Sequence, residues 1–291
     1  MRRSPSAQPH GHLIRSLLLA VPGLMVAILF GPLPGRAAAD AGLPAWESPF
    51  STDPVRAYHC LRAEGAIKVD GLLNEPAWDR AQKIQKFLIP PEVQWDTTSP
   101  DAPSPILIKA HEAKSATTAM LLWNDEYLFF AARLADEDLY GTQGPGHDLP
   151  FGTNDVCELF IKPKDDLPYY WEFHLTPRGT SRDYFYARRS AGGDERWMSY
   201  ESGMKAAVTV KGTINHWEDR DHGYTVEMAI PWSAFDRMGG QPKPGDHWRF
   251  LVSRYDYSVY LEAGVELSAA ASLPRAAYHL YEYYPCLVFD Q

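Results

Sequence analysis

Short apolar and aromatic segments alternate with polar turns along most of the chain. Ten such runs, rich in β-branched or aromatic side chains, are separated by turns that contain Gly, Pro, Asn or Asp. No segment keeps a helical period of 3.6 except two short turns at 75–82 and 231–237, and the proline-rich segment 89–105 is predicted as a long loop. The pattern predicts an all-β antiparallel sandwich of immunoglobulin or jelly-roll type with one or two short helical turns. The predicted strands are 105–113, 116–123, 126–136, 155–163, 169–177, 182–188, 205–212, 224–232, 248–257 and 284–290.

The segment IKVDGLLNEPAW, residues 67–78, combines a strand-like start with a short helical turn. Asp70 and Gly71 are predicted to end the strand, because Gly readily takes a positive φ and Asp tolerates it. Asn74 then stands where a helix-capping side chain is preferred, and a proline follows in the first turn. We expect Trp78 to be buried by this turn and to close one end of the sandwich.

Residues 1–39 have the pattern of a secretory signal peptide. Arginines precede an uncharged apolar run of 14 residues, Leu17–Phe30, and alanines follow up to Ala39, near which we expect cleavage. A single-pass membrane anchor is the alternative, but the run is shorter than the about 20 residues that a span needs. We therefore predict export to the periplasm or the medium and no membrane span after signal removal. A linker or extended lead-in at 40–57 would precede one sandwich domain at 58–291.

Net charge argues against one class of partner. The whole chain carries 28 basic and 37 acidic residues, a formal net charge of −9. Cleavage after Ala39 removes four arginines and no acid, which leaves 24 basic and 37 acidic residues and a net charge of −13. A nucleic-acid-binding protein needs a positive surface to replace the counterions of the phosphates, so we expect no nucleic-acid partner.

The chain contains three cysteines, Cys60, Cys157 and Cys286. Terminal strands often pair in β-sandwiches, so a disulfide between Cys60 and Cys286 is one alternative, and three free thiols are the other. Cys157 lies inside an apolar strand, where we expect it to act as a small buried apolar residue.

Tryptophans within or beside apolar runs are expected to fill the core rather than to contact a ligand. Four of them have this setting: Trp123, Trp217, Trp232 and Trp248. Trp197 lies in the polar segment GGDERWMSY, and the sequence leaves open whether it is exposed.

Two predicted strands that follow one another place two carboxylates and a histidine on one face. Successive side chains of a strand alternate between its two faces, so Glu158 lies opposite the apolar face of DVCELFI. In the same way Glu172 and His174 lie opposite the apolar face of YYWEFHLTP. If the two strands pair in register, these side chains form a polar floor that could contact sugar hydroxyls. A solvated outer sheet with cross-strand charge pairs is the alternative.

Six motifs, in the same order along the chain, resemble family 9 carbohydrate-binding modules. They are VDGLLNEPAWD (69–79), NDEYLFFAARLADED (124–138), LPFGTNDVCELFIKP (149–163), YYWEFHLTPRGT (169–180), GYTVEMAIPW (223–232) and AYHLYEYYPCLVF (277–289). The resemblance covers residues 60–291. It implies an exported, non-catalytic β-sandwich that holds a saccharide or a glycan-bearing partner, with polysaccharide breakdown as the expected setting.

The same resemblance implies which residues contact the sugar. The ligand-stacking aromatic of the family matches Phe151, and Asn154 follows shortly after it. Two polar positions of the family's next strand match Glu172 and His174, which together with Glu158 complete the expected carbohydrate-binding set. A second stacking tryptophan of the family falls in GVELSAAASLPRAAYH (264–279), where this chain has no tryptophan.

Catalysis is not expected, because the sequence has no Gly-x-Ser-x-Gly, His-Glu-x-x-His or Walker motif. One alternative function is a haem-b-binding electron-transfer sandwich with Met198, Met204 or His174 as axial ligands, and another is a structural or interaction module. The sequence requires no cofactor. Structural calcium is used in the family, and the acidic clusters at 136–138 and 218–221 offer oxygen ligands, although an exposed acidic turn would explain both.

Overall fold

The computed structural model describes residues 57–96, 104–142, 146–147, 154–191 and 200–291. They belong to the second of two compact units, Asp40–Gln291, whereas the first unit, Met1–Ala39, lies outside the described residues. The signal peptide and most of the lead-in therefore stay predictions. Phe151, Trp197 and Met198 also lie outside the described residues.

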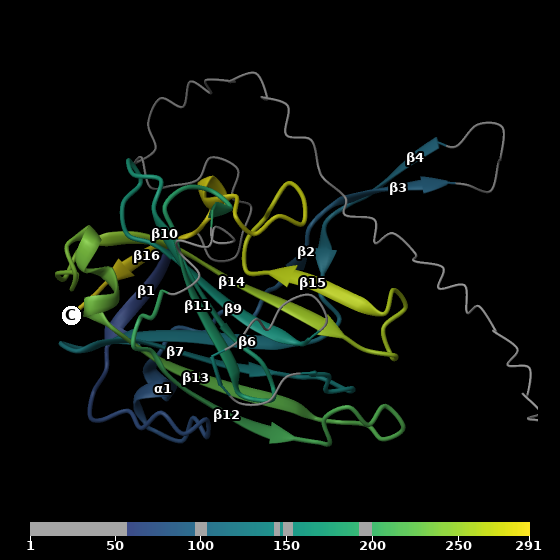
Figure 1. Cartoon of the computed structure of the whole chain (residues 1–291), viewed down its shortest axis with the longest axis horizontal. Helices are drawn as coiled ribbons and strands as arrows, with labels where there is room; N and C mark the ends of the chain where they lie inside the picture. The colour runs from purple at the N-terminus through teal and green to yellow at the C-terminus, as the bar shows by residue number, and fades with distance from the viewer. Residues whose placement is uncertain (1–56, 97–103, 143–145, 148–153, 192–199) are drawn as a thin grey trace, which may run out of the picture. The chain divides into compact units, whose positions relative to one another are not determined.

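Two packed β-sheets form the described unit, which confirms the predicted sandwich (Figure 1). One sheet contains, in spatial order, β12 (Lys205–Lys211), β13 (Gly223–Pro231), β7 (Tyr127–Leu134) and β6 (Thr117–Trp123). The other contains, in spatial order, β16 (Cys286–Phe289), β14 (His247–Tyr257), β9 (Val156–Lys162), β10 (Tyr170–Leu175), β11 (Thr180–Tyr186) and β8 (Gly146–His147). Three further strands extend this second sheet beside β14, namely β15 (Val265–Ala269), β2 (Leu88–Ile89) and β5 (His111–Glu112).

The first described strand, β1 (Ala57–Arg62), joins the two sheets. Its first part pairs in parallel with β16, and its last two residues pair in parallel with β6. The register sets Ala57 opposite Cys286 and Cys60 opposite Phe289. Three positions along a strand correspond to about 10 Å, which is beyond the reach of a disulfide. All three cysteines are free and buried, so the alternative of a Cys60–Cys286 bridge is wrong.

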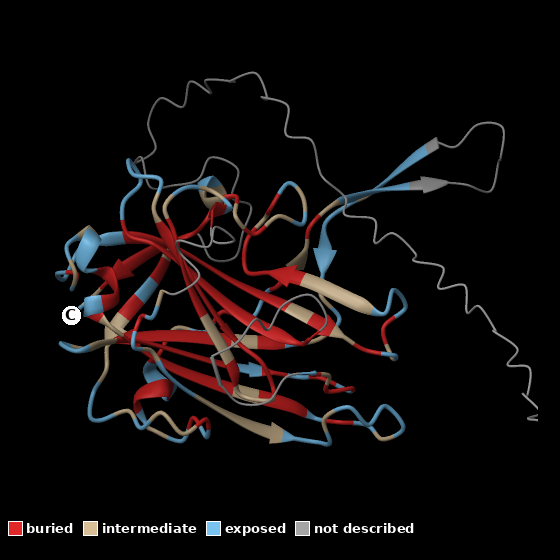
Figure 2. Cartoon of the chain, in the orientation of Figure 1, coloured by how far each residue is buried: buried red, intermediate tan, exposed pale blue. Residues whose placement is uncertain are grey.

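The main hydrophobic core fills the space between the sheets. Figure 2 shows buried residues along most of the strands of both sheets. One sheet contributes residues such as Phe130 and Met228, and the other contributes Trp171 and Phe250, all with an exposed fraction of 0%. These side chains sit at alternate positions of their strands, as the period of two in the sequence requires.

Three of the four tryptophans expected in the core lie there. Trp123, Trp232 and Trp248 are buried and contact one another or Phe289 edge to face. Trp217 is 61% exposed, so the prediction that it fills the core is wrong. It lies in the turn between β12 and β13, where no neighbouring strand covers its ring.

Nine of the ten predicted strands coincide with single strands of the structure. The predicted strand 105–113 is instead divided into β4 (Ser104–Ile108) and β5, which belong to different sheets. The other differences concern weaker patterns. Residues 67–71 form no strand. The segment 89–105 is not a plain loop, because β3 (Glu92–Asp96) pairs with β4 (Ser104–Ile108) in a separate two-stranded sheet. The short strand β15 was not expected, since VELSA has neither the β-branched run nor the aromatic residues of the others.

Short helical turns interrupt the strands, and three of them lie wholly within the residues that the structure describes. The predicted turns correspond to α1 (Ala77–Arg80) and to the 3₁₀ turn η2 (Trp232–Met238), and a third, η3 (Tyr281–Tyr283), was not expected. Asn74 does not cap α1, because the helix begins after Pro76 and has no side-chain cap.

Glu227 on β13 holds the segment before α1 in place. Trp78 is buried as expected, with an exposed fraction of 2%, and its indole Nε1 donates a hydrogen bond to Glu227 Oε1 at 3.1 Å. The prediction that it closes one end of the sandwich is wrong, because it packs with Met120 and Phe129 on the outer face of the first sheet. The backbone N–H groups of Asp70 and Gly71 both donate to the other carboxylate oxygen at 3.0 Å. Residues 67–71 are therefore tied to a side chain rather than to a neighbouring strand. Gly71 has a φ of 77°, and a Cβ there would approach the backbone of Val208 to 2.8 Å, so this turn needs glycine.

Candidate functional site

The predicted polar floor exists on the outer face of the second sheet. β9 and β10 are adjacent and antiparallel, and their register sets His174 directly opposite Glu158. Glu172 lies two residues before His174 and therefore on the same face. All three side chains are buried, with exposed fractions of 2% to 4%. The alternative of a solvated outer sheet is therefore wrong.

A single imidazole nitrogen links the two carboxylates. His174 Nε2 lies 2.6 Å from Glu172 Oε1 and 3.3 Å from Glu158 Oε1. The second oxygen of each carboxylate accepts a hydrogen bond from a hydroxyl on a neighbouring strand. Ser253 Oγ donates to Glu158 Oε2 at 2.6 Å, and the Tyr186 hydroxyl donates to Glu172 Oε2. Four adjacent strands of the second sheet thus fix the positions of these side chains.

Burial and the attraction of His174 shift the pKa values of the two glutamates in opposite directions. Burial raises the pKa of Glu158 to about 7, although the neighbouring His174 opposes this rise. Burial also acts on Glu172, but the attraction and hydrogen bond of His174 outweigh it and lower the pKa of that carboxyl. Burial likewise works against a charged His174, yet the two carboxylates raise its pKa. These shifts favour an ionised Glu172 beside a protonated His174, whereas the pKa of Glu158 is about 7.

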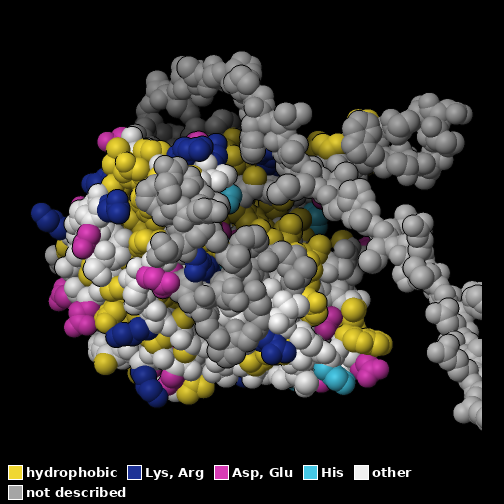
Figure 3. Space-filling view, viewed as in Figure 1, with side chains coloured by type: hydrophobic (Ala, Val, Ile, Leu, Met, Phe, Trp, Pro, Cys, Tyr) yellow, Lys and Arg dark blue, Asp and Glu magenta, His cyan; other side chains and the backbone are white. Residues whose placement is uncertain are grey.

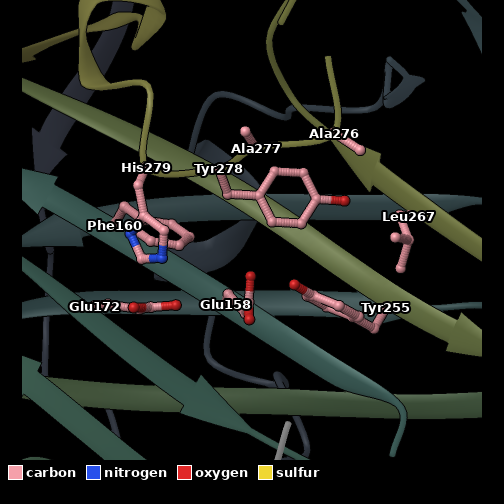
Figure 4. Close-up of a pocket in the computed structure, with 9 residues that line it drawn as sticks. All are labelled: Glu158, Phe160, Glu172, Tyr255, Leu267, Ala276, Ala277, Tyr278 and His279. Atoms are coloured by element: carbon pink, nitrogen blue, oxygen red, sulfur yellow. The ribbon is translucent and has the colours of Figure 1, made fainter. Parts of the chain in front are cut away.

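Both glutamates open into a small cavity of about 170 Å³ (Figure 4). Their carboxylates form one wall, and aromatic rings stand over and beside them. The remaining lining residues are Phe160, Tyr255, Leu267, Ala276, Ala277, Tyr278 and His279. No lysine or arginine is among these lining residues. The cavity thus combines flat apolar surface with hydrogen-bonding groups, the two components that sugar recognition needs.

The residues over the floor come from the chain segment where the family resemblance has a stacking tryptophan. Tyr278 and His279 lie at the end of 264–279, and both line the cavity. The Tyr278 hydroxyl is buried and has no hydrogen-bond partner among the described residues. Sequence reasoning missed Tyr255, Tyr278 and His279, although the aromatic-rich run at the end of 264–279 was the available signal for the last two.

The other two predicted site residues do not join this cavity in the described structure. Asn154 stands before β9 and faces a loop, where its Oδ1 accepts hydrogen bonds from the backbone N–H and hydroxyl of Thr142. Four residues of extended chain, about 13 Å, separate Asn154 from Glu158. Phe151 lies outside the described residues. The binding roles of Phe151 and Asn154 therefore stay predictions.

A second cluster of carboxylates surrounds a buried arginine. Arg254 Nη2 lies 3.0 Å from Asp136 Oδ2 and 3.0 Å from Asp256 Oδ2, and all three residues are buried. Asp155, the third carboxylate of the cluster, accepts hydrogen bonds from the backbone N–H groups of Tyr257 and of the loop after β7. The guanidinium already supplies the positive charge that a calcium ion would bring, so this arrangement does not fit calcium.

The two acidic segments expected as exposed turns are only partly exposed. Asp136, Asp138 and Asp221 are buried, and their carboxylates accept hydrogen bonds from backbone N–H groups of nearby loops. Glu218 and Asp219 have exposed side chains beside His216. The buried carboxylates therefore serve to hold loop backbone at one end of the sandwich.

The described residues do not favour the haem alternative. His174 lies on the outer face of β10, whereas Met204 packs against the core between the sheets. The two side chains therefore lie on opposite sides of the second sheet and cannot share one iron. Met198, the third candidate ligand, lies outside the described residues.

The surface gives no sign of a basic stripe on the face seen in Figure 3. Lys and Arg side chains are interspersed there with Asp and Glu. Among the described residues, no helix has the length and apolarity to cross a lipid bilayer.

Comparisons with known proteins agree with the fold. A solved structure of a proposed carbohydrate-binding protein from Bacteroides uniformis superposes with a TM-score of 0.56 at 12% identity, covering 81% of this chain and 100% of that one. A family 9 carbohydrate-binding module from Caldicellulosiruptor kristjanssonii, solved with cellotriose, covers 80% of this chain and 93% of its own at 12% identity and a TM-score of 0.49. At 12% identity the likeness to the Bacteroides uniformis structure concerns the fold alone.

Sequence comparison identifies the family. The chain is 25% identical over 126 residues, 43% of its length, to the exoglucanase XynX of Acetivibrio thermocellus, of which it spans only 10%. The family model described as "Carbohydrate family 9 binding domain-like" matches residues 69–259, which include both glutamates and the histidine of the polar floor. The chain therefore belongs to the carbohydrate family 9 binding domain-like family.

Proposed function

We propose that this chain is an exported, non-catalytic module that holds a saccharide in the cavity above Glu158 and Glu172. One observation carries the proposal: buried carboxylates and aromatic rings converge on a single cavity of about 170 Å³. Pockets for drug-sized ligands typically enclose roughly 300–1,000 Å³, so this cavity suits one sugar ring rather than a stretch of polysaccharide. A chain end or a single terminal residue of a glycan fits that volume.

Each side of the cavity has a role in this proposal. The rings of Tyr255 and Tyr278 pack against the C–H faces of the sugar, while the carboxylate of Glu158 accepts hydrogen bonds from its hydroxyls. The Tyr278 hydroxyl gains the hydrogen-bond partner that it lacks among the described residues. Phe151 would add a stacking ring from the segment before β9, and Asn154 would support that segment.

The arrangement of the carboxylates favours binding over hydrolysis. A glycosidase places its two carboxyl groups on either side of the bond that it cleaves. Here the inner oxygens of Glu158 and Glu172 lie within 4.8 Å of each other and of His174 Nε2, so the imidazole fills the space between them. The module would then hold a saccharide for other proteins to process, in the periplasm or outside the cell.

A glycan array with residues 40–291 tests whether a saccharide binds, and calorimetry with the strongest hit tests where it binds. Tyr278→Phe removes only the hydroxyl, and Tyr224→Phe is the matched control because Tyr224 also has a buried hydroxyl without a partner among the described residues. We expect Tyr278→Phe to weaken binding about 2- to 10-fold, the worth of one hydrogen bond, and Tyr224→Phe to leave binding unchanged. Full affinity in the Tyr278→Phe protein would remove the cavity as the site, and an empty array would remove the function.

A further inference from the structure

The polar floor has a feature that sugar binding does not require. Three donor atoms from two strands, Glu158 Oε1, Glu172 Oε1 and His174 Nε2, point toward one another and lie within 4.8 Å of one another. Ordinary sugar-binding side chains point outward to the ligand, whereas these atoms converge on a shared point at the bottom of the cavity. Two carboxylate oxygens and one imidazole nitrogen are a common ligand set for a divalent transition metal.

The distances suit a small ion with short bonds. Zinc binds imidazole nitrogen and carboxylate oxygen at about 2.0–2.2 Å, so neighbouring ligand atoms of a tetrahedral site lie roughly 3.3 Å apart. His174 Nε2 and Glu158 Oε1 are 3.3 Å apart, and Nε2 and Glu172 Oε1 are 2.6 Å apart. Of these two pairs, the first already has the distance that the ion requires, and the second has to separate by roughly 0.7 Å. Calcium would instead demand six to eight oxygen ligands at longer distances, which this floor does not offer.

The outer oxygens of the two carboxylates are held as in built metal sites. Ser253 donates a hydrogen bond to the outer oxygen of Glu158, and Tyr186 donates one to the outer oxygen of Glu172. Hydrogen bonds of this kind orient ligating carboxylates and raise metal affinity in known sites. They leave the inner oxygens of both residues free to face the imidazole nitrogen.

A separate observation points to something that is bound above the floor. The Tyr278 hydroxyl is buried, belongs to the wall of the same cavity, and has no hydrogen-bond partner among the described residues. Two members of the cluster, Glu158 and Glu172, border the cavity (Figure 4). The other carboxylate cluster differs on this point, because Arg254 already occupies its centre.

We propose that Glu158, Glu172 and His174 bind one divalent transition-metal ion of the zinc type, with its fourth coordination position open to the cavity. A water molecule or a hydroxyl of a bound saccharide would take that position. The metal site does not depend on the saccharide, so it is tested in the absence of any sugar.

The test uses the purified protein after dialysis against a chelator. The surface holds another histidine beside two carboxylates, His216 with Glu218 and Asp219, so the parent protein for all measurements carries His216→Ala. Calorimetric titration of this parent with Zn²⁺ should show one saturable site per chain. His174→Ala and the near-isosteric Glu158→Gln should each lower the affinity at least 10-fold, and Co²⁺ should produce the intense visible bands of a tetrahedral site.

The outcomes separate cleanly. A parent protein that binds no Zn²⁺ with one-to-one stoichiometry overturns the proposal, whatever the variants do. Zn²⁺ affinity that survives both His174→Ala and Glu158→Gln also overturns it. If His174→Ala does not fold, Glu158→Gln and the Co²⁺ spectrum of the parent decide, because neither depends on removing the histidine. Saccharide binding that persists after chelation would support the proposed function and show that the saccharide does not need the metal ion.

Discussion

The contact between Trp78 and Glu227 offers a quantitative test of how the segment around α1 is held on the outer face of the first sheet. Glu227 has an exposed fraction of 0%, and its two carboxylate oxygens accept hydrogen bonds from three donors: Trp78 Nε1 and the backbone N–H groups of Asp70 and Gly71. Glu227→Gln keeps the shape of the side chain but replaces one acceptor oxygen by an NH₂ group. In either orientation, the NH₂ group of the new amide would point at one or more of these buried N–H donors, which then have no acceptor.

The cost follows from the number of donors left without a partner. If the amide oxygen stays with the two backbone N–H groups, only the Trp78 indole N–H is lost, and one buried unsatisfied group costs about 1–3 kcal/mol. Trp78→Phe removes that donor, so Glu227→Gln made in the Trp78→Phe protein should cost less than about 1 kcal/mol. Trp78→Ala, which also leaves a void, should lower the free energy of unfolding by about 3–5 kcal/mol.

Urea unfolding of the four proteins of this double-mutant cycle and of Trp78→Ala, followed by fluorescence and circular dichroism, measures these differences. Equal costs of Glu227→Gln in the wild-type and Trp78→Phe proteins would show that the indole hydrogen bond contributes nothing. If Trp78→Ala lowers the free energy of unfolding by less than about 1 kcal/mol, the turn that carries Trp78 does not stabilise the fold. Either result would refute the reasoning that this contact holds the segment around α1 against the first sheet.

Three further predictions concern other parts of the chain. Phe151→Ala should weaken saccharide binding by about 1–3 kcal/mol with little change in melting temperature, and a destabilised variant with unchanged affinity would place Phe151 in the core instead. Burial raises the pKa of Asp136 to about 7 despite Arg254, so the folded chain holds a proton that the unfolded chain releases above its pKa of about 4, and stability should fall as pH rises from 4 to 7. Urea unfolding across that range should show a smaller fall for Asp136→Asn, and an equal fall would contradict the assignment. Reductant should leave the melting temperature unchanged, because Cys60 and Cys286 are free; a lower melting temperature in reductant would reveal a disulfide.

The alternation of polar and apolar residues along the chain determined the strands and the strand face on which Glu158, Glu172 and His174 lie. Side chains of a strand alternate between its two faces, so the apolar positions of YYWEFHLTP and DVCELFI assign Glu158, Glu172 and His174 to the opposite face without any knowledge of the fold. The same local rule identified nine of the ten predicted strands, but it merged β4 and β5 into one strand at 105–113. It failed for residues 67–71, whose backbone donors are taken by side chains rather than by a strand.

Tertiary structure decided which of these faces meet and what they enclose. Trp78 and Glu227 are 149 residues apart, and no sequence feature near either residue predicts their contact. The register of β9 and β10 set His174 opposite Glu158, and the segment 276–279 closed over both glutamates to make a cavity. The exposure of Trp217 was set in the same way, by the absence of a covering strand at its turn. The hydrophobic pattern of a sequence depends only on residues that are close along the chain. Burial, cavities and the pKa shifts of buried groups depend on which distant segments pack together.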